Sequence, residues 1–255
     1  MTPTTIEWAT DVWNPVTGCT KVSAGCLHCY AEGVAGRFWG ERQFADVRCH
    51  PERLNAPLRR RKPARVFVNS MSDLFHPDVP KEFINQVFAV MSMASQHTFM
   101  ILTKRPERML GYVMNPPRNV WLGVSIEDQN TADQRIPILL STPAAVRFVS
   151  VEPMLGPVDL YPRLGWLIGG PGISLGPIFG EADGSGPFPD LDWVILGGES
   201  GPGARPMDPE WARSVRDQCA AGPVPFFFKQ MSGRAPIPPD LYVREYPVVA
   251  DVKTA

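Results

Sequence analysis

The stretch Thr98-Phe99-Met100-Ile101-Leu102-Thr103-Lys104-Arg105 contains the pattern that decides the fold. It begins as an apolar, β-prone run and ends in a hydroxyl group and two cations. Before it, Pro80–Ala94 has apolar residues at approximate helical spacing. One unit of the chain is therefore a helix, a short apolar strand and a polar strand end.

The same pattern recurs along most of the chain. Similar β-rich runs lie at Arg65–Asn69, Asn119–Val124, Val146–Val149, Trp193–Leu196 and Pro225–Phe228, with a short strand around Val12–Thr17. Further helices are expected at Ala31–Trp39, at Thr131–Leu140 and at Trp211–Ala220, the last after an Asp208 N-cap and Pro209. We therefore predict an α/β fold with about seven mostly parallel strands, arranged as a partial or closed β/α barrel of the TIM type. An open doubly wound sheet is the alternative, because sequence does not give strand order.

Polar side chains follow each of these strands. The strand ends read Ser70-Met71-Ser72-Asp73, Thr103-Lys104-Arg105, Ser125-Ile126-Glu127, Ser150-Val151-Glu152-Pro153, Gly197-Gly198-Glu199-Ser200 and Lys229-Gln230. In a β/α barrel such positions meet at the C-terminal mouth, where active sites lie. The pattern predicts a shared polar mouth, although polar residues also end strands for no functional reason.

A cysteine cluster lies near the N-terminus, within Asn14–Tyr30. Cys19, Cys26 and Cys29 have the spacing C-x6-C-x2-C, and glycines precede the first two. Structural zinc and ferredoxin-type clusters usually take four protein ligands, so three thiolates indicate a centre with one open position. A [4Fe–4S] cluster whose fourth iron binds S-adenosylmethionine (SAM) is the most economical interpretation, since electron transfer to the sulfonium then cleaves a C–S bond.

Two other interpretations stay open at this stage. In the first, Cys49 or His50 completes a zinc site in a nucleic-acid-binding or adaptor protein that has no catalytic activity. In the second, the barrel is a metal-free enzyme in which Glu152 and Glu199 act as acid and base. Cys219, in a predicted helix, is expected to be a small buried apolar residue.

The chain has 255 residues and a net charge of −1, so it has no overall basic field that would announce nucleic-acid binding. A local cationic run, Arg59–Arg65, is interpreted either as a solvated loop or as a phosphate-contacting surface. No signal-like or membrane-length apolar segment is found, which makes a cytoplasmic location the default expectation. In that compartment, clustered cysteines are more often metal ligands than disulfides.

Residues 1–255 are expected to form a single β/α barrel domain. A Gly/Pro-rich insertion at about 162–192 also contains large apolar residues, so it is either a packed lid or a surface loop. From about residue 232 the chain is rich in proline and is expected to be irregular, with Tyr242–Val249 as a late edge strand.

Seven segments, in the same order, resemble an uncharacterised three-cysteine family common in phages and bacteria and grouped with the radical-SAM barrels. They are Ile6–Tyr30, Phe67–His76, Leu102–Pro106, Leu122–Glu127, Ser150–Pro153, Gly197–Gly201 and Phe227–Gln230. The resemblance implies a radical-SAM enzyme of unassigned reaction, which needs an external electron donor such as a flavodoxin or ferredoxin. By analogy with DNA-acting radical-SAM lyases, a nucleotide or nucleic acid is a candidate substrate beside a small molecule.

The match to radical-SAM enzymes proper is looser. Their usual spacing is C-x3-C-x2-C, with an aromatic residue near adenine just before the last cysteine, a position that His28 takes here. Gly197-Gly198-Glu199 resembles their amino-group-binding motif but lies on a late strand, whereas the place after the second strand holds Asn69–Asp73.

These arguments give the set of candidate site residues. The expected metal ligands are Cys19, Cys26 and Cys29, and the candidate catalytic residues are Lys104, Glu152 and Glu199. The candidate cofactor-binding residues are His28, Tyr30, Ser72, Asp73, Ser125, Glu127, Ser150, Gly197 and Gly198. Lys104 and Arg105 are expected either to hold a phosphate or carboxylate or to pair with Glu127 and Glu152.

Overall fold

The computed structural model describes residues 1–160, 191–201 and 203–248, and it has a mixed α/β fold. Its main sheet has eight strands in the order β1 (Thr2–Pro3), β2 (Asp11–Trp13), β5 (Arg65–Val68), β6 (Thr98–Thr103), β7 (Val120–Ile126), β8 (Arg147–Val151), β9 (Trp193–Gly197) and β10 (Phe226–Gln230). Only the β1–β2 pair is antiparallel in this sheet. Strand order thus follows chain order without the reversal of a doubly wound sheet, which confirms the predicted β/α arrangement and excludes that alternative.

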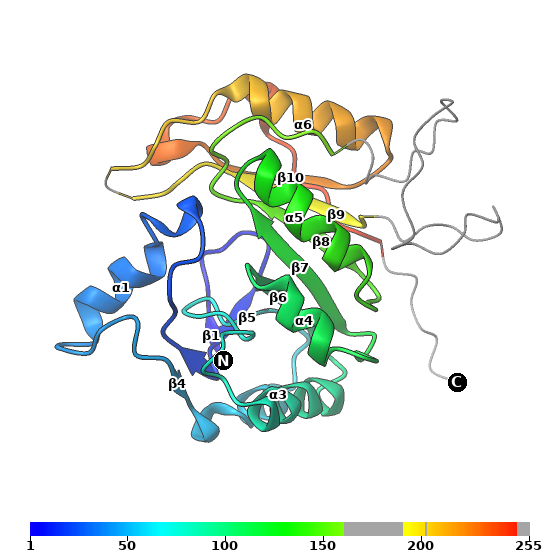
Figure 1. Cartoon of the computed structure of the whole chain (residues 1–255). Coiled ribbons are helices and arrows are strands. Elements are labelled where there is room, and N and C mark those ends of the chain that lie inside the picture. The colour runs from blue at the N-terminus through cyan, green and yellow to red at the C-terminus, as the bar shows by residue number, and fades with distance from the viewer. Residues whose placement is uncertain (161–190, 202, 249–255) are drawn as a thin grey trace.

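The helices that connect these strands lie along the outer side of the curved sheet (Figure 1). They are α3 (Lys81–Met93), α4 (Pro106–Tyr112), α5 (Gln129–Leu140) and α6 (Pro209–Ala221). Asp128 begins α5 with a capping box, and the Asp208 side chain caps α6 as predicted. The short α4, which the sequence analysis did not predict, starts directly after Arg105 with a proline at its first position.

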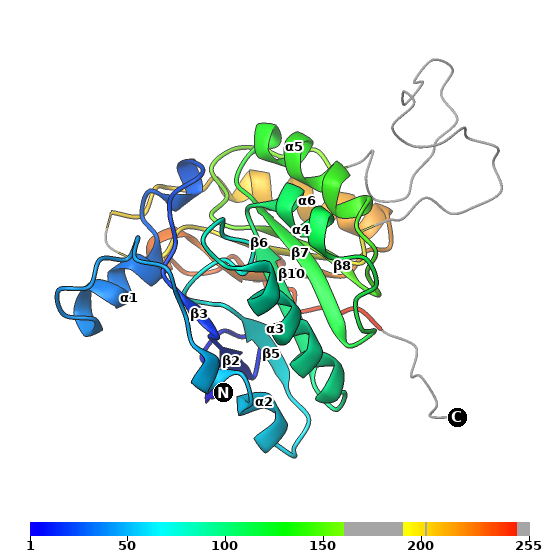
Figure 2. The ribbon, with the colours of Figure 1, turned by 60° about the horizontal axis from the view of Figure 1, so that its bottom comes forward.

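The long β2–β5 connection carries the cysteine loop. It contains α1 (Tyr30–Phe38), α2 (Ala56–Arg59) and a small antiparallel sheet of β3 (Val16–Thr17) and β4 (Arg48–Cys49). Figures 1 and 2 show α1 at the end of the sheet, apart from the layer of α3 to α6. The cysteine loop and α1 therefore lie beside the strand ends rather than on the outer helical layer.

The described sheet is open, because no ladder joins β1 to β10, so the fold is the partial form of the predicted barrel. Two details of the prediction need correction. The strand expected around Val12–Thr17 is two strands in different sheets, separated at Pro15, which has no N–H to donate. In the described part of Tyr242–Val249, a single bridge between Arg244 and Phe227 replaces the expected edge strand.

Alternate strand residues pack into two apolar layers. Residues such as Val149, Leu196 and Phe228 join the helices in the outer core. Their neighbours Phe148 and Phe227 belong to a second, aromatic cluster, together with Trp8, Phe67, Trp121 and Trp193. This alternation is expected, because successive side chains of a β-strand point to opposite faces of the sheet. On the inner face, the strand ends beyond the aromatic cluster are available for a site.

The Gly/Pro-rich insertion expected at about 162–192 lies almost wholly outside the described residues. The tail from Ser232 has two short 3-10 turns, at Ser232–Arg234 and Pro239–Leu241, in place of regular elements. Among the described helices, none has the length and apolar character needed to cross a membrane.

Candidate functional site

A cavity of about 560 Å³ lies at the carboxyl ends of the parallel strands, within the size range of small-molecule sites. All three clustered cysteines line it, and so do polar residues from the ends of β5 to β10. These residues are Ser70, Ser72, Asp73, Lys104, Arg105, Ser125, Ser150, Glu152, Gly198, Glu199, Ser200, Lys229 and Gln230. The cysteine loop and the strand ends, far apart in sequence, therefore enclose one space.

The structure brings most of the candidate residues to this cavity. His28 and Tyr30 also line it, whereas Glu127 is fully buried beneath it and Gly197 is absent from its wall. Gly198 has a packing reason to be glycine, because a Cβ there would lie 2.3 Å from the backbone nitrogen of Ser232. Close backbone packing therefore explains why the second residue of Gly197-Gly198-Glu199 is a glycine, without an amino-group-binding role.

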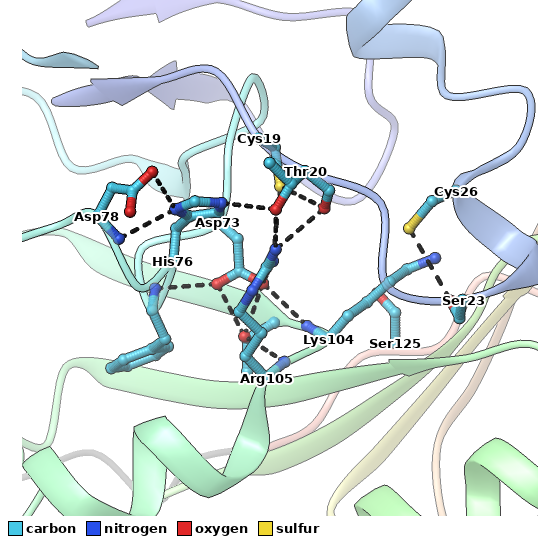
Figure 3. Close-up of polar contacts among 12 residues, drawn as sticks. Cys19, Thr20, Ser23, Cys26, Asp73, His76, Asp78, Lys104, Arg105 and Ser125 are labelled. Carbon is cyan, nitrogen blue, oxygen red and sulfur yellow. Dashed lines mark hydrogen bonds and ion pairs between the residues drawn. The ribbon is translucent and has the colours of Figure 1, made fainter. Parts of the chain in front are cut away.

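Arg105 forms hydrogen bonds with the start of the cysteine loop, at Cys19 and Thr20 (Figure 3). Its Nη1 donates to Cys19 Sγ at 3.5 Å and to Asp73 Oδ2 at 3.2 Å. Its Nη2 donates to both the carbonyl and the hydroxyl oxygen of Thr20 at 3.0 Å. The strand end of β6 thus holds the loop through one guanidinium group.

A buried histidine holds the same loop from the other side. His76 Nδ1 accepts the backbone N–H of Asp78, so in the neutral ring the proton lies on Nε2, which donates to Thr20 Oγ1 at 2.8 Å. Burial and the nearby charge of Arg105 lower the pKa of His76. His76 was quoted in the family resemblance but was not predicted as a site residue, and no spacing in the sequence links it to Thr20.

The second cysteine lies over a buried ionic network. Glu127 accepts from Ser23 Oγ at 2.7 Å and from Lys104 Nζ at 2.6 Å, and it pairs with Arg135 at 3.3 Å. Gly25 permits this contact, because a Cβ there would lie 2.4 Å from Glu127 Cγ. Ser23 Oγ in turn lies 3.9 Å from Cys26 Sγ. The expected pairing of Lys104 with Glu127 is present, and it supports the loop around Cys26.

Glu199 anchors His28 and Arg205 at the opposite wall. Its carboxylate lies 2.9 Å from His28 Nδ1 and accepts from Arg205 Nε at 3.0 Å. Burial would raise the pKa of Glu199, but the Arg205 and His28 hydrogen bonds outweigh it and lower the pKa to about 2. Glu199 is therefore ionised near neutral pH, which is the wrong protonation state for a general acid. Arg205 lies in a loop beyond the strand end and carries no sequence signal that would have indicated it.

Glu152 forms a more exposed pair in the cavity wall. It accepts from Lys229 Nζ, and both side chains keep about a fifth of their surface exposed. Lys229 was noted as a strand end but was not predicted as a site residue. Tyr30, whose hydroxyl donates to the Ser70 carbonyl at 2.6 Å, links the first turn of α1 to the end of β5.

The three clustered thiols line one cavity without forming a site for a single metal ion. Within the described ranges, no three His, Cys, Asp or Glu side chains are placed to hold one ion. In a cluster, each thiolate binds a different iron atom, so three thiols around one cavity need not converge on a point. The fourth ligands that zinc would need lie elsewhere: Cys49 is in β4, and both ring nitrogens of His50 have partners, Thr17 and Glu52.

The first two cysteines differ in the pKa of their thiols. Burial, and then the charge of Asp73, raise the pKa of Cys19 to about 11. Burial opposes ionisation of Cys26 as well, but Lys104 and the hydrogen bonds from the loop lower its pKa below the ordinary value. The Cys26 thiol is therefore more acidic than the Cys19 thiol.

The cationic run does not belong to this site. Arg65 begins β5, whereas the cavity lies at the other end of the strands. Arg60 pairs with the buried Asp11 at 3.1 Å, and the Arg65 guanidinium lies over the ring of Tyr246. At least these two cations have local structural partners.

The fold resembles solved structures only at low sequence identity. No curated protein matches the chain. Among solved structures, a mutant of spore photoproduct lyase matches with a TM-score of 0.49 at 12% identity, covering 87% of this chain and 76% of that one. Spore photoproduct lyase complexed with dinucleoside spore photoproduct matches with a TM-score of 0.38 at 12% identity, over 80% of this chain and 58% of that one.

These structural likenesses are too weak to inform the reaction or the substrate. A family model gives a firmer result, because it matches nearly the whole chain, residues 3–239. The chain therefore belongs to the family described as "Protein of unknown function (DUF5131)".

Proposed function

We propose that the protein is a radical-SAM-type iron–sulfur enzyme. In this proposal Cys19, Cys26 and Cys29 hold a [4Fe–4S] cluster, and SAM binds beside it in the cavity. The observation that carries the proposal is that all three thiols of one loop line a cavity formed by the polar ends of six parallel strands. When bound, such a cluster supplies the electron that cleaves SAM reductively.

The cavity contains groups that suit the carboxylate of SAM and groups for a second molecule. The hydroxyls of Ser125 and Ser150 are donors for a carboxylate. Ser72 and Asp73 are instead proposed to shape the wall, because the Ser72 hydroxyl donates to the Val16 carbonyl and Asp73 already accepts from Thr103 and Arg105. His28, held by Glu199, is the nearest counterpart of an adenine-contacting aromatic residue. Ionised Glu199 is assigned the role of positioning His28, in place of the catalytic role expected from the sequence.

The partly exposed Glu152–Lys229 pair is the best candidate for contact with the substrate. Both groups line the cavity, and each can bind a polar substrate atom or move a proton when the pair opens. Lys104 is already bound to buried Glu127, so its proposed role is to hold the loop near Cys26 rather than to act on substrate.

The substrate is proposed to be a small molecule or a nucleotide. The Glu152–Lys229 pair in the cavity wall suits a small polar molecule, and the position of the cationic run at the other end of β5 removes one argument for a nucleic acid. The electron is proposed to come from an external donor protein. The exposure of Val22 and Leu27, in the cysteine loop itself, supports this, since it lets another protein approach the cluster.

The test is anaerobic reconstitution with iron and sulfide. We expect a brown protein that contains iron and acid-labile sulfide and whose reduced EPR spectrum changes when SAM is added. The Cys49→Ala variant is a matched control and should behave like the wild type. A colourless protein with stoichiometric zinc, or a cluster spectrum indifferent to saturating SAM, would refute the proposal.

A further inference from the structure

We propose that Arg105 is a positioning residue for Cys19 that makes the iron–sulfur centre easier to reduce. The inference rests on the proposed function, since it concerns the same three-cysteine loop. It adds a role for a cation that was otherwise expected only to bind a phosphate or carboxylate, or to pair with a carboxylate.

The guanidinium group of Arg105 uses both of its terminal nitrogens on the loop. Nη1 points a proton at Cys19 Sγ, 3.5 Å away, while Nη2 binds both oxygens of Thr20, the next residue. A planar guanidinium fixes direction as well as charge, which a lysine ammonium cannot do. Arg105 therefore sets both the place of the loop and the hydrogen-bond environment of the Cys19 sulfur.

Asp73 keeps this guanidinium in place. Asp73 is buried, and its carboxylate accepts from Thr103 Oγ1 at 2.8 Å, from the Phe75 N–H at 2.9 Å and from the Lys104 N–H at 3.1 Å. Arg105 joins them at 3.2 Å and has a side-chain exposure of 11%. With so many donors fixing Asp73, the cation has little freedom to move away from Cys19.

The arrangement is asymmetric among the cysteines. In the part of the chain that the structure describes, Cys19 is the cysteine whose sulfur accepts from a guanidinium group. The side-chain contact of Cys26 is the Ser23 hydroxyl at 3.9 Å. The Cys19 corner of the proposed cluster would thus have a guanidinium hydrogen-bonded to its sulfur, whereas the Lys104 ammonium, whose charge acts on Cys26, is paired with Glu127.

The sign of the effect follows from charge. Reduction adds an electron, so a nearby cation and an N–H···S bond stabilise the reduced form and raise the reduction potential. Asp73 acts in the opposite direction, because it is a nearby anion. Removing Arg105 and neutralising Asp73 should therefore move the potential in opposite directions.

The experiment is an EPR-monitored redox titration of the reconstituted full-length protein. We expect Arg105→Met to shift the midpoint to a more negative potential and Asp73→Asn to shift it to a more positive one. Arg105→Lys should fall between Arg105→Met and the wild type, because it keeps the charge but loses the forked contact. Arg213→Met, which breaks an exposed Arg213–Asp240 pair, is the matched control and should leave the potential unchanged.

General destabilisation of the loop would not produce shifts of opposite sign. The inference is overturned if Arg105→Met leaves the potential unchanged or raises it, or if Arg105→Met and Asp73→Asn shift it in the same direction. If Arg105→Met does not bind iron, the midpoint potentials of Arg105→Lys and Asp73→Asn relative to the wild type still test the predicted direction of the shift. A wild-type protein that binds no cluster refutes the proposed function itself, so the two failures are distinct.

Discussion

The inner face of the sheet differs between its two ends. At one end, Trp193 packs in the described structure against the rings of Trp8, Trp121, Phe148, Phe227 and Tyr246. At the other end, inward side chains of the same strands are serines and paired charges around the cavity. The difference indicates that the aromatic end stabilises the fold through apolar burial. The polar end gives up part of that stabilisation, because it places polar and charged groups around the cavity.

Replacing Trp193 by alanine tests the aromatic end, with the largest expected effect on stability. The side chain is fully buried, so the variant should lose about 3–5 kcal/mol of unfolding free energy. Urea unfolding measures this loss, and iron bound per folded chain should stay at the wild-type level. A variant of normal stability that no longer binds iron would show that the two ends are not separate in function.

Glu127→Gln tests the polar end. The neutral amide leaves Lys104 and Arg135 without their buried anion, and unfolding free energy should fall by about 3 kcal/mol. Iron binding should also fall, because Ser23 loses its anchor beside Cys26. The exposed pair of Glu210 with Arg213 offers the control Glu210→Gln, for which less than about 1 kcal/mol is expected. Full iron binding by Glu127→Gln would count against the proposed support of the loop.

Acid titration sharpens the comparison further. The folded-state pKa of Glu199, about 2, is below its ordinary value of 4.5. Its contribution to the free energy of unfolding is therefore fully present above pH 4.5 and is lost as the pH falls toward 2, on the order of 3 kcal/mol. Urea midpoints measured across this range should fall less in Glu199→Gln than in the wild type. Parallel curves for the two proteins would contradict the assigned pKa.

The smallest expected effect concerns a helix cap at the polar end. Asp128→Ala removes the capping box of α5 and should cost about 1 kcal/mol. Asp208→Ala removes the cap of α6 and should cost a similar amount. Thermal unfolding compares the two variants, and both should bind iron normally. Selective loss of iron in Asp128→Ala would place the start of α5 within the site.

Much of this fold was predictable from local pattern. The apolar runs before Asp73, Lys104 and Glu152 gave the strands, and because strand ends share one edge of a parallel sheet, their meeting was also predictable. The break at Pro15 was not predicted, although a proline lacks the N–H that a continuous strand would donate there. The open edge was not predictable either, because closure depends on the tilt and stagger of all the strands.

The contacts within the site were less predictable than its location. Cys19, Cys26 and Cys29 are close in sequence, so their spacing alone suggested a shared centre. His76 and Arg205, in contrast, reach Thr20 and Glu199 through loops whose path only tertiary packing fixes. Side chains of this kind look like ordinary polar residues until the fold places a partner beside them.

The most direct test of the central claim is the iron and sulfide content of single cysteine variants after anaerobic reconstitution. The account predicts that Cys19→Ala, Cys26→Ala and Cys29→Ala each lose the cluster, whereas Cys49→Ala and Cys219→Ala keep it in full. Loss of the cluster in Cys49→Ala, or its retention after removal of any one of the three loop cysteines, would contradict a centre held by three thiolates with one open position.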